Sequence, residues 1–257
     1  MNLKERLRVA GGFAAKHLTA SALIAVCCAA LVFGLWYPYP YSELASGREL
    51  FVLLISVDIV AGPLLTFIVY NPKKPRRELW RDVGTVIVLQ LAALGYGLHI
   101  VAQARPVFLA FEGDRFRVVA VPDIDSASLV RAPSGMARLS WAGPQLIGVK
   151  LLAGSDPDYQ QSLILAVQGV HPAYRPERWV DYDVQRQLVI RSSKPLAELK
   201  RKRPEQSSLI DEAMRDKGLV ETDLGYLPLL SAHHTDWIVA VGLKDGSPRL
   251  YLPIDGW

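Results

Sequence analysis

The sequence predicts a membrane protein with three N-terminal transmembrane α-helices followed by an α+β soluble domain that contains an antiparallel sheet. One observation is that the long apolar runs all lie within residues 1–104, and three of them reach about 20 residues, the length that spans a bilayer. Another is that residues 105–257 have the mixed composition of a water-soluble domain. We therefore divide the chain into a membrane domain, 1–104, and an exported domain, 105–257.

The first predicted helix covers residues 18–36 and contains no charged side chain. It ends in a membrane-interface motif that combines aromatic rings with helix-ending prolines: Trp36, Tyr37, Pro38, Tyr39 and Pro40. The basic lead-in before it, residues 1–17, is either a helix on the inner leaflet or a solvated flank. A signal peptide cleaved after Ala30 is an alternative, which would leave two helices and the same exported domain.

The second predicted helix, residues 50–70, contains one carboxylate, Asp58, and one helix-bending proline, Pro63. A carboxylate in lipid is costly, so Asp58 should face protein or water. Counted from Leu50 at 1.5 Å per residue, Asp58 lies about 12 Å into the membrane from the outer side.

The third predicted helix, residues 83–104, has only Gln90, His99 and Gln103 as larger polar groups. Tyr96 shares the depth of Asp58 and His99 lies one turn nearer the surface, so either side chain can reach the carboxylate. Asp58, Tyr96 and His99 form a candidate intramembrane polar site for partner binding. We add Arg48 to this site, because it lies where the chain enters the second helix. A purely structural Asp58, or one used in proton or ion chemistry, is the alternative.

Charge predicts the orientation in the membrane. Four cations and one acid precede the first helix, and a basic run lies between the second and third helices, where we assign four topogenic residues: Lys73, Lys74, Arg76 and Arg77. Positive loops stay on the cytoplasmic side. The N-terminus is thus predicted to be cytoplasmic, and three crossings place the exported domain in the periplasm of a bacterium, anchored in the inner membrane.

The charge balance and the motifs exclude several classes of function. The net charge of +4 belongs entirely to the membrane half, because residues 105–257 carry 19 cations and 19 acids. A nucleic-acid binder would carry its basic patch on the soluble domain, so we exclude nucleic acid. His233, His234 and Asp236 match no zinc spacing, and no nucleotide-binding or serine-nucleophile motif is present. We therefore predict no metal, no cofactor and no enzyme activity.

The exported domain contains no cysteine, since Cys27 and Cys28 both lie in the first helix. Apolar runs at 106–111 and 116–121 flank a glycine-containing turn and predict a hairpin, and residues 236–241 and 249–253 predict another. Residues 146–152 are a further strand candidate. Residues 194–217 predict one long helix that is broken at Pro204 and ends before Gly218.

A string of motifs runs in order along the chain: WYPYP at 36–40, GREL at 47–50, VDIVAGPLLT at 57–66, NPKK at 71–74, RREL at 76–79, QLAALGYG at 90–97, ARPV at 104–107 and FRVV at 116–119. In these motifs the chain resembles the type IV pilin accessory protein family, which includes the FimB-like proteins. It covers the first half of the chain closely, and we find no catalytic residue to carry over from the family.

The resemblance implies an inner-membrane protein that promotes or tunes the assembly of the major pilin. We expect a pilin chaperone whose helices hold the pilin's membrane stem and whose exported domain contacts the pilin's head. Its other expected partners are the lipid bilayer and further pilus assembly components. A membrane-anchored periplasmic sensor or scaffold, which binds a ligand or an envelope protein, is the rival prediction.

Overall fold

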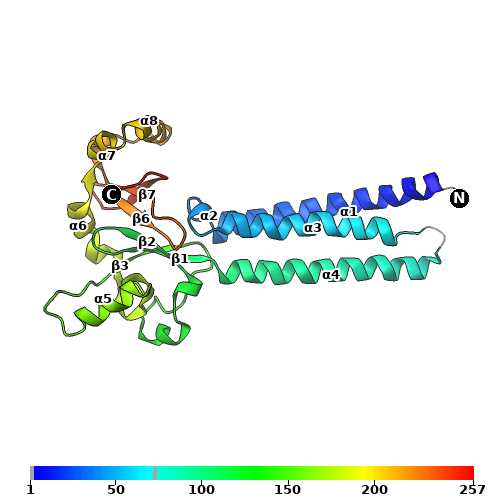
Figure 1. The fold of residues 1–257 in the computed structure, drawn as a ribbon, viewed down its shortest axis with the longest axis horizontal. Helices are drawn as coiled ribbons and strands as arrows, with labels where there is room; N and C mark the ends of the chain where they lie inside the picture. Colours follow the sequence, from blue (N-terminus) through cyan, green and yellow to red (C-terminus); the bar gives the residue numbers. More distant parts are fainter. Residues whose placement is uncertain (1–2, 72–73) are drawn as a thin grey trace. The chain divides into compact units, whose positions relative to one another are not determined.

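A computed structural model describes residues 3–71 and 74–257 (Figure 1). Lys73, one of the predicted topogenic residues, lies outside the described residues. The chain divides into two compact units. The helical unit comprises Met1–Ser42 with Ser46–Ala104, and the sheet unit comprises Glu43–Ala45 with Arg105–Trp257. Each unit is described by itself below.

Three long helices form the helical unit, and each is long and apolar enough to cross a membrane: Arg8–Trp36, Gly47–Val69 and Arg76–Gln103. The long helices are α1 Leu3–Leu31, α3 Gly47–Val69 and α4 Arg76–Gln103. α1 continues as a π-helical turn over Val32–Trp36, and a short helix, α2 Tyr41–Leu44, precedes α3. The prediction of three helices that can span a membrane is confirmed.

The helices extend further than the apolar runs that predicted them. α1 absorbs most of the basic lead-in, and α4 begins at Arg76, directly after Pro75. Hydropathy marks only the part of a helix that suits lipid, whereas backbone hydrogen bonding continues until a cap or a proline ends it. The basic lead-in that we considered as a helix on the inner leaflet or a solvated flank is therefore continuous with α1 from Leu3 onward.

α3 is the helix that packs against both of the other long helices. Near its C-terminal end, the Tyr70 ring stacks on Phe13 of α1 with centroids 4.1 Å apart. One turn earlier, the hydroxyl of Thr66 lies 2.6 Å from Nδ1 of His17. A polar contact of this kind pairs groups that lipid could not satisfy, and it holds α1 in register with α3.

Tyr37, a residue of the predicted membrane-interface motif, is fully buried among the helices. Its hydroxyl donates a hydrogen bond to the carbonyl of Val101 in α4, at 2.9 Å. Its ring lies so close to Gly47 that a Cβ there would approach a ring carbon within 2.2 Å. The segment after α1 is thus tied to the end of α4 and to the start of α3.

An eight-stranded mixed sheet forms the centre of the sheet unit in the described part of the chain, with the strand order β4-β3-β1-β2-β6-β7-β8 and β5 paired to β6. The strands are β1 Pro106–Phe111, β2 Phe116–Ala120, β3 Gln145–Val149, β4 Trp179–Asp181, β5 Lys194–Pro195, β6 Leu224–Leu230, β7 Trp237–Gly242 and β8 Pro248–Leu252. The helices are α5 Tyr159–Val167, α6 Tyr182–Ser192, α7 Leu196–Lys202 and α8 Ser207–Asp216.

Both predicted hairpins are confirmed as the antiparallel pairs β1–β2 and β7–β8. The predicted helix over 194–217 is α7 and α8, interrupted by a 3₁₀ turn that starts at Pro204. The prediction of an antiparallel sheet was wrong in part, because β1 pairs with β3 and β2 pairs with β6 in parallel. Parallel neighbours require long crossover connections, and turn chemistry in the sequence reports only the tight hairpins.

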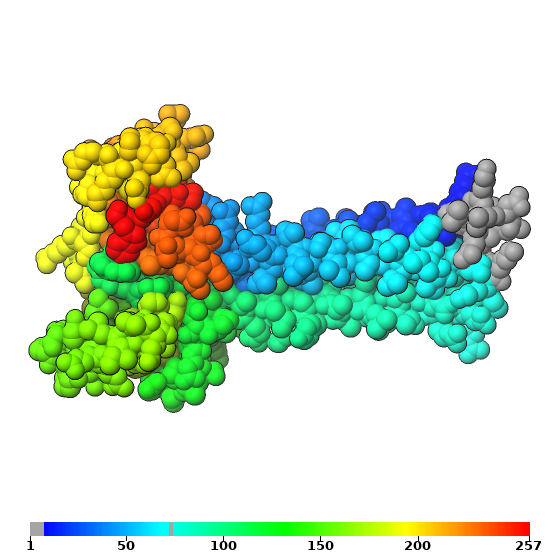
Figure 2. Space-filling view, viewed as in Figure 1, coloured from blue at the N-terminus to red at the C-terminus, as the bar shows by residue number. Residues whose placement is uncertain are grey.

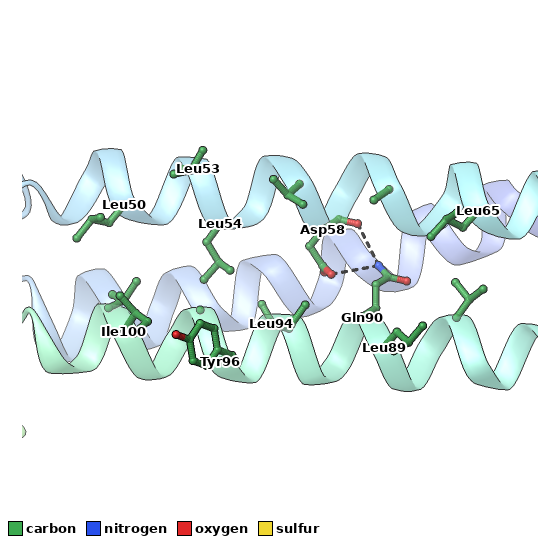
Figure 3. Close-up of a pocket in the computed structure, with 16 residues that line it drawn as sticks. Leu50, Leu53, Leu54, Asp58, Leu65, Leu89, Gln90, Leu94, Tyr96 and Ile100 are labelled. Atoms are coloured by element: carbon green, nitrogen blue, oxygen red, sulfur yellow. Dashed lines mark hydrogen bonds between the residues drawn. The ribbon is translucent and has the colours of Figure 1, made fainter.

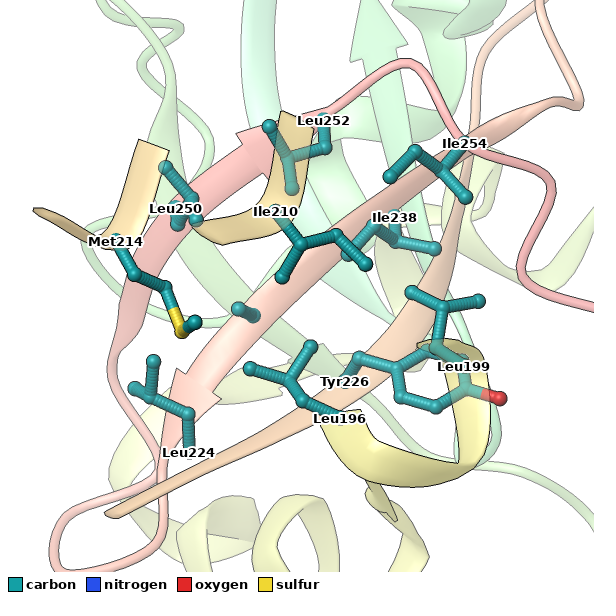
Figure 4. Close-up of a cluster of buried hydrophobic side chains, with 11 residues drawn as sticks. Leu196, Leu199, Ile210, Met214, Leu224, Tyr226, Ile238, Leu250, Leu252 and Ile254 are labelled. Atoms are coloured by element: carbon teal, nitrogen blue, oxygen red, sulfur yellow. The ribbon is translucent and has the colours of Figure 1, made fainter. Parts of the chain in front are cut away.

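Two hydrophobic cores lie along this sheet. One packs Phe108 of β1 against Trp179 of β4, with ring centroids 4.6 Å apart. The other joins the β6–β8 strands to α7 and α8, with Tyr226 and Ile210 fully buried (Figure 4). The β2–β6 ladder, which links the two halves, contains only the pairs Phe116 with Leu229 and Arg117 with Leu230.

Candidate functional site

A long apolar groove of about 480 Å³ runs between α3 and α4 (Figure 3). The two helices lie side by side along their length in the space-filling view (Figure 2), as their packing requires. Apolar side chains from both helices form most of its walls, among them Leu50, Leu54 and Leu65 from α3 and Leu89, Leu94 and Ile100 from α4. Because both helices can span a membrane, this α3–α4 groove would be an intramembrane surface.

Asp58 and Gln90 form a polar centre within the groove. The Gln90 amide nitrogen donates to the Asp58 carboxylate at 3.2 Å and to the Asp58 backbone carbonyl at 3.0 Å (Figure 3). The Gln90 Oε1 atom is buried and has no hydrogen-bond donor among the described residues. A buried acceptor without a donor is costly, so the polar centre has acceptor capacity left over.

Two glycines allow the helices to come this close. A Cβ at Gly62 would lie 2.1–2.3 Å from the Gln90 amide atoms, and a Cβ at Gly97 would lie 2.1 Å from a methyl group of Leu54. Gly62 follows Asp58 by four residues, so both lie on one face of α3. Asp58 and the glycine that makes room for its partner Gln90 are thus one helical turn apart in the sequence.

Gln90, rather than Tyr96 or His99, is the partner that the structure gives to Asp58. His99 follows Gln90 by nine positions, which at about 100° per residue puts it on the opposite side of α4, where it is exposed. Tyr96 lines the groove but remains 70% exposed. Arg48 is exposed in the first turn of α3, away from the polar centre along the helix. The structure therefore brings together only Asp58 and Tyr96 of the four predicted residues.

The signal that identifies Gln90 was present in the sequence. It was one of three larger polar groups in the third apolar run, and Leu94, Gly97 and Val101 follow it at helical spacing. This spacing places a polar side chain and a glycine on one face of α4. We did not predict Gln90 as the partner of Asp58, because we compared only depths in the membrane. Depth does not specify which face of a helix a residue occupies.

The remaining predicted residues occupy mixed environments. In the interface motif Trp36 and Tyr37 are buried, Pro38 is half-buried, Tyr39 is 60% exposed and Pro40 is buried. Only Tyr39 therefore presents the exposed ring that a headgroup anchor needs.

The described topogenic residues flank the start of α4. Lys74 donates to the Asp82 carboxylate at 2.6 Å. Arg76 and Arg77 are exposed in the first turn of α4. Exposed basic residues at the end of a helix that can cross a membrane suit a headgroup region.

A second polar feature lies in the sheet unit and is built around a buried ion pair. Arg117 donates to Glu112 at 2.8 Å, and both side chains are less than a tenth exposed. The other Glu112 carboxylate oxygen accepts the amide of Ala173 at 3.0 Å. Each partner is hydrogen-bonded, so the pair anchors the β1–β2 hairpin rather than offering a free reactive group.

A cleft of about 500 Å³, which we call the sheet cleft, adjoins this ion pair. It is lined by Arg117 of β2 and by Leu230, the last residue of β6, which pairs with Arg117. His171, Tyr174 and Asp123 line it. Burial lowers the pKa of His171, and the nearby positive charge of Arg117 adds to the effect, whereas burial raises the pKa of Asp123. Both shifts favour the neutral form. The described residues contain no group of three His, Cys, Asp or Glu side chains that could hold a metal.

Comparisons with known proteins match this chain over most of its length. A family model described as "Fimbrial assembly protein FimB" matches residues 2–46. Two proteins of Dichelobacter nodosus, "Fimbrial assembly protein, serogroup E1" and "Fimbrial assembly protein, serogroup I", are 31% and 32% identical over 92% of this chain and 92% of their own. A third, for serogroups C1 and C2, is 38% identical over 47% of this chain and 92% of its own. No solved structure matches.

Proposed function

This chain belongs to the fimbrial assembly protein family, and from that premise we propose that it is a type IV pilin accessory protein of the bacterial inner membrane. In this proposal it is not an enzyme and needs no cofactor. It acts as a chaperone or modulator that binds the major pilin and promotes or tunes pilus assembly.

The observation that carries the proposal is the alignment with fimbrial assembly proteins across 92% of the chain, both units included. The architecture suits the role, because the chain combines three helices that can cross a membrane with a folded sheet unit. A pilus subunit that waits in the membrane would present a membrane stem and an extracytoplasmic head. A partner for such a subunit needs one surface for each.

Loss of the gene tests the proposed function. We expect surface pili to fall to a small fraction of the wild-type level while pilin is still made, as shown by electron microscopy and by immunoblots of whole cells. A plasmid copy of the full chain should restore the pili. Normal piliation in the deletion strain would contradict the proposal.

We further propose that the N-terminus is cytoplasmic and the sheet unit periplasmic, because Lys74, Arg76 and Arg77 would then lie inside. With both cysteines replaced by alanine, a Lys244→Cys variant should react with a membrane-impermeant maleimide from the periplasm, since Lys244 is 82% exposed. An Arg77→Cys variant should react only after the inner membrane is lysed. The reverse pattern would overturn the orientation.

A second candidate function is a membrane-anchored sensor or scaffold that binds a ligand or an envelope protein. The sheet cleft favours it, because Arg117, His171 and Asp123 converge there on about 500 Å³. Small anions and candidate metabolites should raise the melting temperature of the full chain in detergent if the cleft is a ligand site. The absence of any shift would favour the pilin accessory role.

A further inference from the structure

We infer that the α3–α4 groove binds one transmembrane helix of another protein, and that this helix presents a hydrogen-bond donor to the polar centre. The inference rests on the proposed function, which makes that protein the pilin subunit. It specifies the face of the helical unit that is used and the chemistry that is recognised.

The length of the groove matches a helix rather than a small molecule. Its α3 side runs from Leu50 to Leu65, about 22 Å at 1.5 Å per residue, which is most of the hydrocarbon thickness of a bilayer. The α3 positions that line it are 50, 53, 54, 57, 58, 61 and 65, which are separated from one another by three- and four-residue steps. This repeat forms a single stripe along the helix, as helix–helix packing requires.

Apolar walls alone would not select a protein partner, because lipid chains are as apolar as leucine and would cover the groove equally well. The polar centre changes this balance. Acyl chains can donate no hydrogen bond to the Asp58 carboxylate or to the Gln90 Oε1 atom, and the Gln90 amide nitrogen is already used by Asp58. A partner helix with a hydrogen-bond donor at this level would satisfy these two acceptors, which lipid cannot.

The position of the polar centre defines the donor. Asp58 is the middle residue of α3, so the complementary group lies near the middle of the partner helix, not at its charged end. A hydroxyl or amide side chain meets this requirement at a lower desolvation cost than an ammonium group. Ala93, which lines the α4 wall of the groove, is small, and this lets another helix approach closely.

Photo-cross-linking in the native membrane tests the inference with matched pairs of positions. The rim of the groove carries Val57 and Leu89, which are 60% and 64% exposed. The control positions Val60 and Val88 are 63% and 65% exposed on the same two helices but do not line the groove. A photoreactive amino acid is placed at each of the four positions in the full chain, in cells that make pilin.

A carboxylate-free variant tests the role of the polar centre. In the Val57 probe strain, Asp58→Leu should lower the yield of the pilin adduct about tenfold, the effect expected from loss of one or two interhelical hydrogen bonds. Asp58→Asn keeps an acceptor oxygen and should retain most of the yield. Membrane levels of each variant are measured by immunoblot, and the adduct yield is divided by that level.

The expected result is a pilin adduct at Val57 and Leu89 and little at Val60 and Val88. Equal yields at all four positions, adducts with lipid alone, or adducts with a second copy of this chain would each overturn the inference. Piliation of the deletion strain separates this failure from failure of the proposed function. If pili are lost on deletion but the groove traps no pilin, only the docking site is wrong.

Discussion

Replacing Glu112 with alanine should destabilise the sheet unit by about 3–5 kcal/mol, because the Arg117 guanidinium would remain buried without a counter-charge. The backbone amide of Ala173 would also lose its acceptor. Urea unfolding of the full chain in mild detergent, followed by the protease resistance of the sheet unit, measures this change.

Asp114 provides the matched control on the same hairpin turn. It pairs with Arg115 at 2.7 Å, but its side chain is 62% exposed, so Asp114→Ala should cost only about 0–1 kcal/mol. Replacing the buried pair together, with Glu112→Leu and Arg117→Met, should recover much of the stability lost in Glu112→Ala. If Glu112→Ala costs no more than Asp114→Ala, the ion pair does not anchor the hairpin.

The second large effect is expected at Gly62. In a Gly62→Ala variant the new methyl group would collide with the Gln90 amide, so Gln90 must move and release Asp58. We expect a loss of about 1–3 kcal/mol in α3–α4 packing from overfilling, seen as a lower melting temperature of the full chain in detergent.

A second substitution separates the clash from the lost hydrogen bonds. Gly62→Ala combined with Gln90→Ala removes the collision and should recover the melting temperature, but it leaves Asp58 without a partner in α4. The control is Gly95→Ala, because a Cβ at Gly95 meets no atom within 4 Å. A melting temperature for Gly62→Ala equal to that of Gly95→Ala would disprove the close approach at Gly62.

Local signals predicted much of the fold, and long-range pairings did not follow from them. Hydropathy located three membrane-length helices, and turn residues located the β1–β2 and β7–β8 hairpins. β6 was missed because Pro228 interrupts its apolar run, yet Pro228 precedes the two residues that pair with β2. Proline is tolerated where no ladder hydrogen bond is required of it. The parallel pairs depend on long connections, which leave no periodic pattern.

The candidate site was predicted in part for a similar reason. Asp58 stood out because an acid is rare in an apolar run, and the structure places it in the α3–α4 groove. Its partner was predicted from depth alone, which selected Tyr96 and His99. The pairing with Gln90 depends on which faces of α3 and α4 meet, and this is decided by the small residues Gly62 and Gly97.

The two cores and the short β2–β6 ladder have a consequence for how an exported chain would mature. The strands β1 to β4 come first in the chain and share a core of their own, whereas residues 229 and 230 must arrive before the halves can join. Contacts so distant in sequence form slowly. A chain threaded through a translocation channel could therefore fold its first half early, while the complete sheet would close only once its last strands have left the channel.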